Sequence, residues 1–378
     1  LMGNELLVSE RISAIRLNGR DFQYPLSAGD ILRQTSVRFA ARCFLDYVFQ
    51  CMYRKAKQPL DCSLEDWIIH RFGNTLYNNF FRGYTKKLWG ISSDKISSDW
   101  AAQRISLLNL WDVALRSFGL KKSIPRTYTR NFFYPRSGIG QIFKRIAEEI
   151  KKNRGTIILN ATFKRLHISG GRVTGVTCSI NGKDEMIPSD WVISTIPITE
   201  LFNSMSKRQN KDFGVSLKSL RYRSLRFLNI LIDKPNIGNN TWIYIPEAKY
   251  IMTRIQEPKR RSPHNAPDGK TSLILEIPCF YRDEIWKMSD NQLYGKCVED
   301  LFKLGIDIES RVIDYFFTSA RHAYPIYQLD YRIHLDKLVS CINRLENVSL
   351  CGRNGLFRYI LMDEAMEMGF AAAMVVRE

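Results

Sequence analysis

The spacing of apolar residues divides the chain into a helical part and a part built from strands. From about residue 27 to 122, apolar residues recur at intervals of three and four, as in residues 36–55, SVRFAARCFLDYVFQCMYRK. This spacing predicts amphipathic helices. Ser63 is the expected N-cap of one of them, with Asp66 three residues on, which is close to a capping box. Residues 11–26 alternate around the pair Asn18–Gly19, and this pattern predicts a short hairpin.

Beyond about residue 125 the pattern changes to short strands. A glycine turn at 137–140 leads into an amphipathic helix, and residues 156–196 form strand-like runs joined by tight turns, which predicts a β-meander. Five more strand-like runs follow between 220 and 335, with a helix near 289–304. The chain ends in a strand, a loop and an apolar helix. The sequence therefore predicts a mixed α/β (α+β) fold.

The amino-acid composition indicates which class of protein this chain belongs to and which kind of partner it can bind. With 378 residues, 45% of them hydrophobic, the chain suits two or three folded domains. No apolar stretch is long enough for a transmembrane segment. The net charge of +18 favours anionic partners such as phosphates, nucleotides or acidic lipids. Nucleic acid is not expected, because no nucleic-acid-binding motif accompanies the charge. The eight dispersed cysteines, without a C-x-x-C pair, indicate reduced thiols, a cytoplasmic location and no metal site.

Two stretches carry candidate chemistry. Residues 80–90, FFRGYTKKLWG, combine aromatic and cationic side chains, which suits a flat anionic ligand; the alternative is that the aromatic residues form a helix core. Residues 350–363, LCGRNGLFRYILMD, place Arg353 directly after a buried strand, where an arginine can contact a phosphate; the alternative is an ordinary surface arginine. A third stretch, SGIGQIFKR, has Phe143 where a dinucleotide fingerprint needs its third glycine, so it predicts only a turn and a helix start.

Six stretches in this order carry a family resemblance: YTKKLWGISSDKISSDWAAQRI, YPRSGIGQIFKRIAEEI, VISTIPITEL, TRIQEPKRRS, AYPIYQLDY and CGRNGLFRYILMDEAMEMG. Together they resemble the FAD-dependent proteins grouped with protoporphyrinogen oxidase-like amine oxidases and with UDP-galactopyranose mutase. The resemblance implies an FAD-binding domain of the GR2, Rossmann-like type, a helical unit and an antiparallel substrate sheet. It assigns 27–125 to the helical unit, 1–26 and 206–338 to the sheet domain, and 126–205 and 339–378 to the FAD domain.

The glycine-rich βαβ unit with which this family begins has no counterpart in the sequence. The FAD domain is therefore expected to be incomplete at its N-terminus, through truncation or through genuine loss. Because that unit normally offers backbone N–H groups to the cofactor pyrophosphate, we expect weak or absent FAD binding by this chain.

The resemblance also implies roles for single residues. Trp89 would stack against a flat part of the substrate, with Lys86 on the polar side of the same wall. Arg104, offset by one position from the family pattern, Arg254 and Tyr359 would hold a diphosphate. The residues expected at the cofactor are Phe163, Thr195, Gly352, Arg353, Met362 and Asp363. Two departures leave the substrate class open: Leu361 stands where the mutases have an acidic residue, and Glu364–Ala365 replaces the His-Ser of many oxidase-like relatives.

Three functions follow from the resemblance. The first is an FAD-dependent oxidoreductase, in which a substrate gives hydride to flavin N5. The alternative is a mutase-like isomerase, in which reduced flavin N5 attacks the anomeric carbon of a UDP-sugar. The third is a flavin-free fragment that only binds substrate. In each case the expected partner is an anionic small molecule, with a nucleotide sugar as one candidate; the sequence predicts no oligomeric state.

Overall fold

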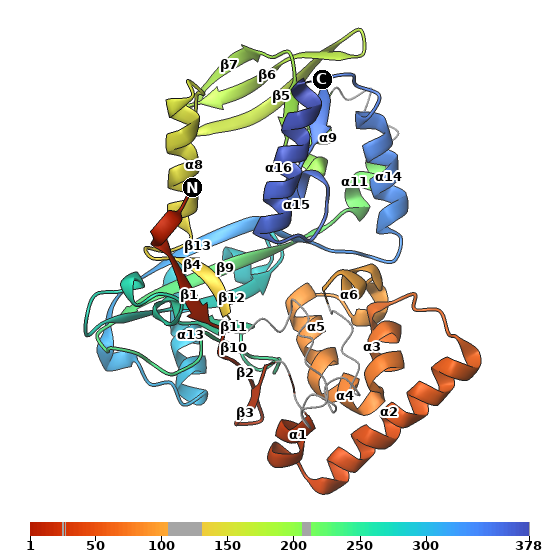
Figure 1. Cartoon of the computed structure of the whole chain (residues 1–378), viewed down its shortest axis with the longest axis vertical. Helices are drawn as coiled ribbons and strands as arrows, with labels where there is room; N and C mark the ends of the chain where they lie inside the picture. Colours follow the sequence, from red (N-terminus) through yellow and green to blue (C-terminus); the bar gives the residue numbers. More distant parts are fainter. Residues whose placement is uncertain (25, 27, 105–130, 206–212, 378) are drawn as a thin grey trace. The chain divides into compact units, whose positions relative to one another are not determined.

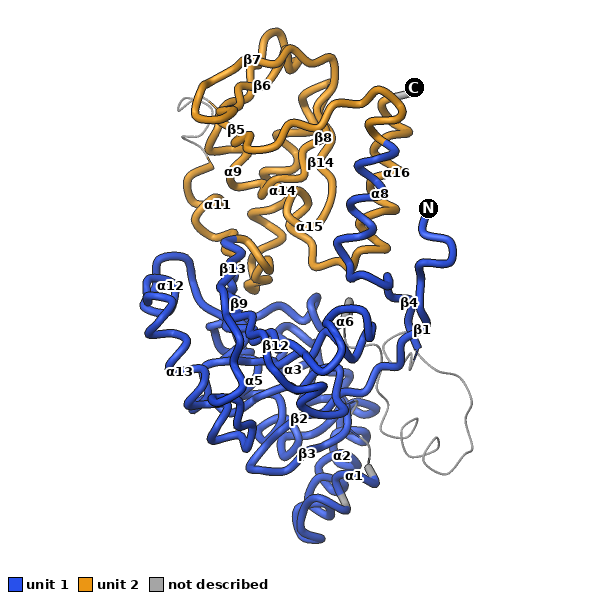
Figure 2. The backbone as a smooth tube through the Cα atoms, turned by 90° about the vertical axis from the view of Figure 1, so that its left-hand side faces the viewer, with its two compact units in different colours: residues 1–149, 223–321 blue, residues 150–222, 322–378 orange. Residues whose placement is uncertain are grey.

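The computed structural model describes residues 1–24, 26, 28–104, 131–205 and 213–377. Within this part the chain divides into two compact units, coloured separately in Figure 2. Unit 1 comprises residues 1–149 and 223–321, and unit 2 comprises residues 150–222 and 322–378. The expected division into three domains stays a prediction.

Unit 1 is built on a seven-stranded sheet. Its strands, in spatial order, are β13 (Val312–Pro325), β9 (Tyr222–Ile232), β12 (Thr271–Cys279), β11 (Arg254–Gln256), β10 (Trp242–Tyr244), β2 (Ser13–Leu17) and β3 (Arg20–Gln23). The β2–β3 hairpin turns at Asn18 and Gly19, which have φ values of 52° and 71°, as the Asn-Gly pair predicts. The sheet is largely antiparallel, but β10 pairs in parallel with β2.

One face of this sheet forms the core of unit 1. Side chains alternate along each strand, so Ile243, Ile255 and Leu275 point to the same side. Helix α13 (Asp290–Lys303) packs on them through Leu293, with Cys297 and Leu301 also buried.

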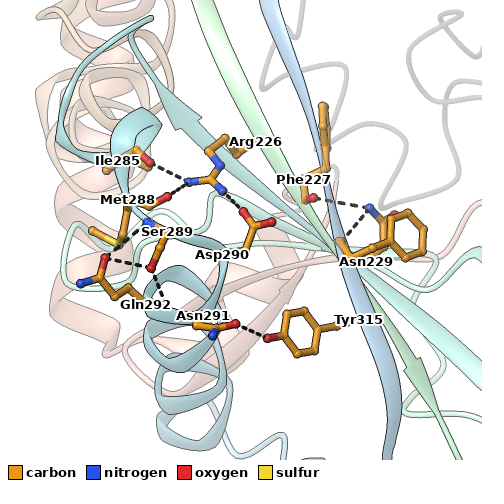
Figure 3. Close-up of polar contacts among 11 residues, drawn as sticks. Arg226, Phe227, Asn229, Ile285, Met288, Ser289, Asp290, Asn291, Gln292 and Tyr315 are labelled. Atoms are coloured by element: carbon orange, nitrogen blue, oxygen red, sulfur yellow. Dashed lines mark hydrogen bonds and ion pairs between the residues drawn. The ribbon is translucent and has the colours of Figure 1, made fainter.

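Polar contacts hold the start of α13 against the sheet. Ser289 and Gln292 form a capping box at its N-terminus. Arg226 of β9 donates hydrogen bonds to the backbone oxygens of Ile285 and Met288 and forms an ion pair with Asp290 (Figure 3). Residues Glu284–Lys287 form the short helix α12.

The expected helices up to residue 104 are present and lie together in Figure 1, whereas the helical stretch expected up to about residue 122 lies outside the described residues. They are α1 (Ala28–Gln34), α2 (Val37–Lys57), α3 (Leu64–Phe72), α4 (Asn74–Leu76), a π-helical turn (Tyr77–Phe81), α5 (Arg82–Trp89) and α6 (Asp99–Arg104). Ser63 and Asp66 form a full capping box at the start of α3, as predicted. Strands β1 (Leu6–Glu10) and β4 (Asn131–Pro135) pair outside the main sheet, and α8 (Gly140–Lys152) follows the glycine turn.

Unit 2 contains the predicted meander and a small parallel sheet. The meander consists of β5 (Ala161–Ser169), β6 (Arg172–Ile180) and β7 (Lys183–Pro188). The next strand, β8 (Val192–Ser194), leaves it and pairs in parallel with β14 (Val348–Leu350). The buried side chain of Asn347 joins the two sheets by hydrogen bonds to Val173 and Asp190.

The helices in the described part of unit 2 are α9 (Ile198–Asn203), α11 (Gly214–Ser219), α14 (Tyr331–Ile342), α15 (Gly352–Gly355) and α16 (Met362–Arg377). The end of the chain therefore has the strand, loop and helix that its pattern predicts. Of the helices in the described part of the chain, none is long and apolar enough to cross a membrane.

Candidate functional site

A row of functional side chains crosses three strands of the unit 1 sheet. The strand register places Tyr244 of β10 opposite Arg254 of β11, and Arg254 opposite Glu276 of β12. Their side chains share one face of the sheet, opposite the apolar core. The Arg254 guanidinium forms a two-point ion pair with Glu276, whose side chain is almost fully buried. It also lies 6.0 Å from the centre of the Tyr244 ring.

A second row follows two residues along the same strands. Trp242 lies opposite Gln256, and Arg261 donates a hydrogen bond to the Gln256 side chain while its guanidinium lies 5.3 Å from the Trp242 ring. Burial lowers the pKa of Arg261, but an arginine stays charged at neutral pH. The buried Trp242 Nε1 and Ser13 Oγ atoms have no hydrogen-bond partner within the described structure. Unsatisfied polar atoms of this kind are typical of a face that takes a ligand or water.

Side chains from other segments complete this group. Tyr24 packs on Tyr244 at 4.8 Å, and Tyr84 of α5 meets the same ring edge-on at 6.0 Å. Arg11 lies over the Tyr24 and Trp242 rings, at 5.2 and 4.9 Å. We call this set the arginine–aromatic cluster: Arg11, Tyr24, Tyr84, Trp242, Tyr244, Arg254 and Arg261. The cluster contains three arginines, and one of them, Arg254, pairs with the carboxylate of Glu276.

The stretch at residues 80–90 contributes both to this cluster and to the helix core. Phe80 packs edge-on against Phe22 at 5.4 Å. Trp89 is only 2% exposed and lies edge-on against Trp100, with 5.3 Å between the rings. A substrate-stacking role for Trp89 stays a prediction, whereas Tyr84 of the same helix lies in the cluster.

The two lysines of this stretch have different surroundings. Lys86 is exposed, whereas Lys87 donates hydrogen bonds to the backbone oxygens of Ile245, Glu247 and Met252 at 2.9, 2.9 and 2.6 Å. Burial lowers the pKa of Lys87 to about 7, an effect that the nearby carboxylates of Asp300 and Glu247 oppose. Lys87 therefore ties α5 to the loop between β10 and β11.

A second candidate region lies in unit 2, at the end of β14. Gly352 has a φ of 75°, a conformation that favours glycine. The Arg353 guanidinium donates to the backbone oxygens of Ala323 and Ile360 and lies 4.8 Å from the ring of Tyr359. Strand, glycine and arginine thus come together at a C-terminal strand end, where α/β sheets bind their ligands.

The residues at this edge fit a bound cofactor. The backbones of β8 and α15 approach so closely that a Cβ on Gly355 would lie 2.6 Å from the Ser194 carbonyl oxygen. The buried Ser194 Oγ and Asn354 Oδ1 atoms have no hydrogen-bond partner in the described structure. Thr195, which follows β8, is exposed. The edge thus offers unsatisfied polar atoms and one cation to a phosphate-bearing group.

The other residues expected at a site are more scattered. Phe163 lies half-buried on β5, and Met362 and Asp363 are exposed in the first turn of α16. Arg104 ends α6, and its side chain lies outside the described part of the structure. The roles expected for these residues, and for Arg254, Arg353 and Tyr359, stay predictions.

Most of the arginine–aromatic cluster was not predicted from the sequence. The alternation of Trp242, Ile243 and Tyr244 was a usable signal, because it places two aromatic residues on the face opposite the core. No sequence signal placed Arg11 or Arg261 beside them, since that proximity depends on strand register and on a loop.

The chain is similar to a known protein family. A family model described as UDP-galactopyranose mutase matches residues 79–295, more than half of the chain. The chain belongs to the UDP-galactopyranose mutase family. This confirms the resemblance found in the sequence. The matched segment includes five members of the cluster: Tyr84, Trp242, Tyr244, Arg254 and Arg261.

Solved structures share the fold. A reduced UDP-galactopyranose mutase has a TM-score of 0.81 and 19% identity, over 99% of this chain and 78% of that one. A putative protoporphyrinogen oxidase from Exiguobacterium sp. 255-15 has a TM-score of 0.68 and 14% identity, over 99% and 83%. A putrescine oxidase bound to putrescine has a TM-score of 0.61 and 13% identity, over 100% and 84%. The expected flavoenzyme fold is therefore confirmed.

Proposed function

We propose that this chain is a mutase-like flavoenzyme that binds a nucleoside diphosphate sugar at the arginine–aromatic cluster. The observation that carries the proposal is the cluster itself, which lies in the segment that matches the mutase family. Guanidinium groups pair with phosphate oxygens in a two-point geometry, and aromatic rings stack on a flat base. The cluster offers both within one unit.

FAD is the cofactor that the family resemblance implies, and it would supply a nucleophilic or hydride-accepting centre at N5. Residues at the β14 edge would hold it, with Arg353 contacting the pyrophosphate, Gly352 leaving open space beside the backbone and Thr195 exposed at the same edge. In the cluster, Arg254 and Arg261 would bind and orient the substrate diphosphate. Weak FAD binding stays a prediction, and the visible absorbance of protein that has passed through gel filtration after incubation with FAD tests it.

The second candidate is an FAD-dependent oxidoreductase, because proteins named as oxidases share this fold. The charge of the cluster restricts its substrate. The three arginines of the cluster would repel a diamine such as putrescine, whereas they would attract a substrate that carries carboxylates or phosphates. Under either candidate the substrate is an anion.

A binding experiment tests the substrate class without depending on flavin. Replacing Arg254 alone would remove the ion pair of the buried Glu276 carboxylate, so the useful variant is the double substitution Arg254→Gln with Glu276→Gln. A charge-assisted phosphate contact is worth about 1.5–3 kcal/mol, so we expect UDP to bind this variant roughly tenfold or more weakly by calorimetry. The matched control removes the exposed Arg172–Glu346 pair of unit 2 by the same two changes. Equal UDP affinity in both double variants and in the parent would refute the proposal.

Turnover distinguishes the remaining functions. Conversion of UDP-galactopyranose in the presence of FAD and dithionite would establish the mutase. Oxygen consumption with a carboxylated substrate, without sugar isomerisation, would establish the oxidoreductase. UDP binding with neither activity, and with no retained flavin absorbance, would leave the substrate-binding fragment as the function.

A further inference from the structure

Helix α2 is apolar on two opposite faces, and only one of them packs against other described residues of unit 1. Its buried residues are Cys43, Tyr47 and Gln50, which recur at intervals of three and four and face the rest of unit 1. Close packing on this side is visible at Gly73, where a Cβ would lie 2.7 Å from the Cβ of Asp46. This face accounts for the attachment of α2 to α3 and α4.

The opposite face carries large apolar side chains in contact with solvent. Their spacing of three, four, seven and eight residues places them on one stripe along the helix. Their exposed fractions are Val37 80%, Phe44 58%, Leu45 66%, Phe49 59% and Met52 59%. Leu60, just beyond the helix, is 84% exposed. We call the five helical residues the α2 apolar stripe. Single exposed apolar residues are ordinary, but a contiguous stripe marks an interaction surface.

The charges around the stripe are all of one sign. Arg38 and Arg42 follow Val37 by one and five positions and lie on the same side of the helix as Leu45 and Phe49. Arg54, Lys55 and Lys57 are exposed in the last turns. The one acidic residue of the helix, Asp46, accepts hydrogen bonds from the backbone N–H and the hydroxyl of Thr75, on the packed side. The outer face therefore combines bulky apolar groups with cations and no acid.

We propose that the α2 apolar stripe lies on the surface of a bilayer that contains anionic phospholipids. A helix with Lys and Arg beside a stripe of Phe, Leu and Met has the composition of a helix that lies in the plane of a membrane interface. The apolar side chains enter the boundary between headgroups and acyl chains, and the arginines reach the lipid phosphates. The net charge of +18 adds a long-range attraction to such a surface.

Charge argues for this occupant over a second copy of the chain. Two α2 stripes packed together would bring Arg38 and Arg42 of one copy against cations of the other in either orientation, and α2 offers no acid on that face to compensate. An anionic lipid surface supplies the apolar layer and the negative charge together. The helix lies on the membrane and does not span it, in agreement with the absence of a spanning helix from the described residues.

Vesicle co-sedimentation tests the proposal with the full chain. We expect binding to vesicles of phosphatidylcholine mixed with phosphatidylglycerol, and much weaker binding to phosphatidylcholine alone. The double variant Phe44→Ser with Phe49→Ser should lose this binding. The matched control is Phe302→Ser with Phe316→Ser, which removes two phenylalanines that are 67% and 50% exposed elsewhere in unit 1 and should bind like the parent.

A charge variant provides an independent measurement. Arg38→Ala with Arg42→Ala should weaken binding to the anionic vesicles by about fivefold for each arginine removed. Arg165→Ala with Arg344→Ala removes two exposed arginines of unit 2 and should change it little. Absence of vesicle binding by the parent would overturn the proposal. Equal vesicle binding by the stripe variant and its control would also overturn it. A stripe variant that differs from the parent only by a smaller mass in gel filtration would overturn it too, and would identify a second copy of the chain as the occupant of the stripe.

Discussion

Replacing Lys87 by methionine tests how α5 is held against the sheet of unit 1. Methionine keeps the unbranched stem and the helix propensity of lysine but removes the Nζ group, which donates to three backbone oxygens. A hydrogen bond contributes about 1 kcal/mol net, so the loss of three should lower the free energy of unfolding by about 3 kcal/mol. In a unit of this size, that corresponds to a decrease in Tm of about 6–12 °C.

The pH dependence of this effect has a definite sign. Burial lowers the pKa of Lys87 to about 7, below its ordinary value of 10.5. Between these two pH values the unfolded chain binds a proton that the folded protein has released, so the contribution of Lys87 to stability rises with pH. The slope is at most about 1.4 kcal/mol per pH unit. Because methionine does not titrate, the cost of Lys87→Met should be greater at pH 9 than at pH 7, by roughly that slope per unit.

Urea unfolding at several pH values measures both quantities, and Lys86→Met is the matched control. Lys86 is the neighbouring residue on the same helix but is exposed, so its substitution should change stability by less than about 0.5 kcal/mol. Equal stabilities of the two variants would refute the anchoring role of Lys87. A pH slope identical in the Lys87 variant and the parent would refute the lowered pKa.

Three further substitutions probe the packing. Gly90→Ala would place a Cβ 2.5 Å from the ring of Phe280 at a φ of 71°, and calorimetry should show a loss of about 2–4 kcal/mol. Ser289→Ala removes the N-cap of α13, and urea unfolding should show a loss of about 1 kcal/mol, with an unchanged m-value. Gly355→Ala would place a Cβ 2.6 Å from the carbonyl oxygen of Ser194 and should force β8 and α15 apart. Amide hydrogen exchange in unit 2 should then become faster, and unchanged exchange rates would contradict this packing.

Local signals predicted local structure well. Asn18–Gly19 predicted the hairpin turn, and Ser63 with Asp66 predicted the capped start of α3. The meander turns and the helix at 290–303 follow from the same short-range chemistry. In each case the residues that determine the structure are neighbours in sequence, so no tertiary information was needed.

Contacts between distant segments were not predictable in this way. The sequence of β8 resembles that of a fourth meander strand, but this strand pairs in parallel with β14, more than 150 residues later. Lys86 and Lys87 are neighbouring residues of the same type, so the sequence does not distinguish them. The path of the β10–β11 loop decides which of the two lysines it buries. Pairings that close long loops depend on the whole fold, and a local pattern does not encode them.

The arginine–aromatic cluster lies wholly in unit 1, and the β14 edge lies in unit 2. This separation has a consequence for the order of binding. The arginine–aromatic cluster is assembled by strand register, by α5 and by the Lys87 contacts, none of which involves unit 2. Its affinity for a nucleoside diphosphate should therefore be present without FAD and should decrease when Lys87 no longer holds α5 in place. Substrate recognition would then be a property of the unit 1 sheet alone.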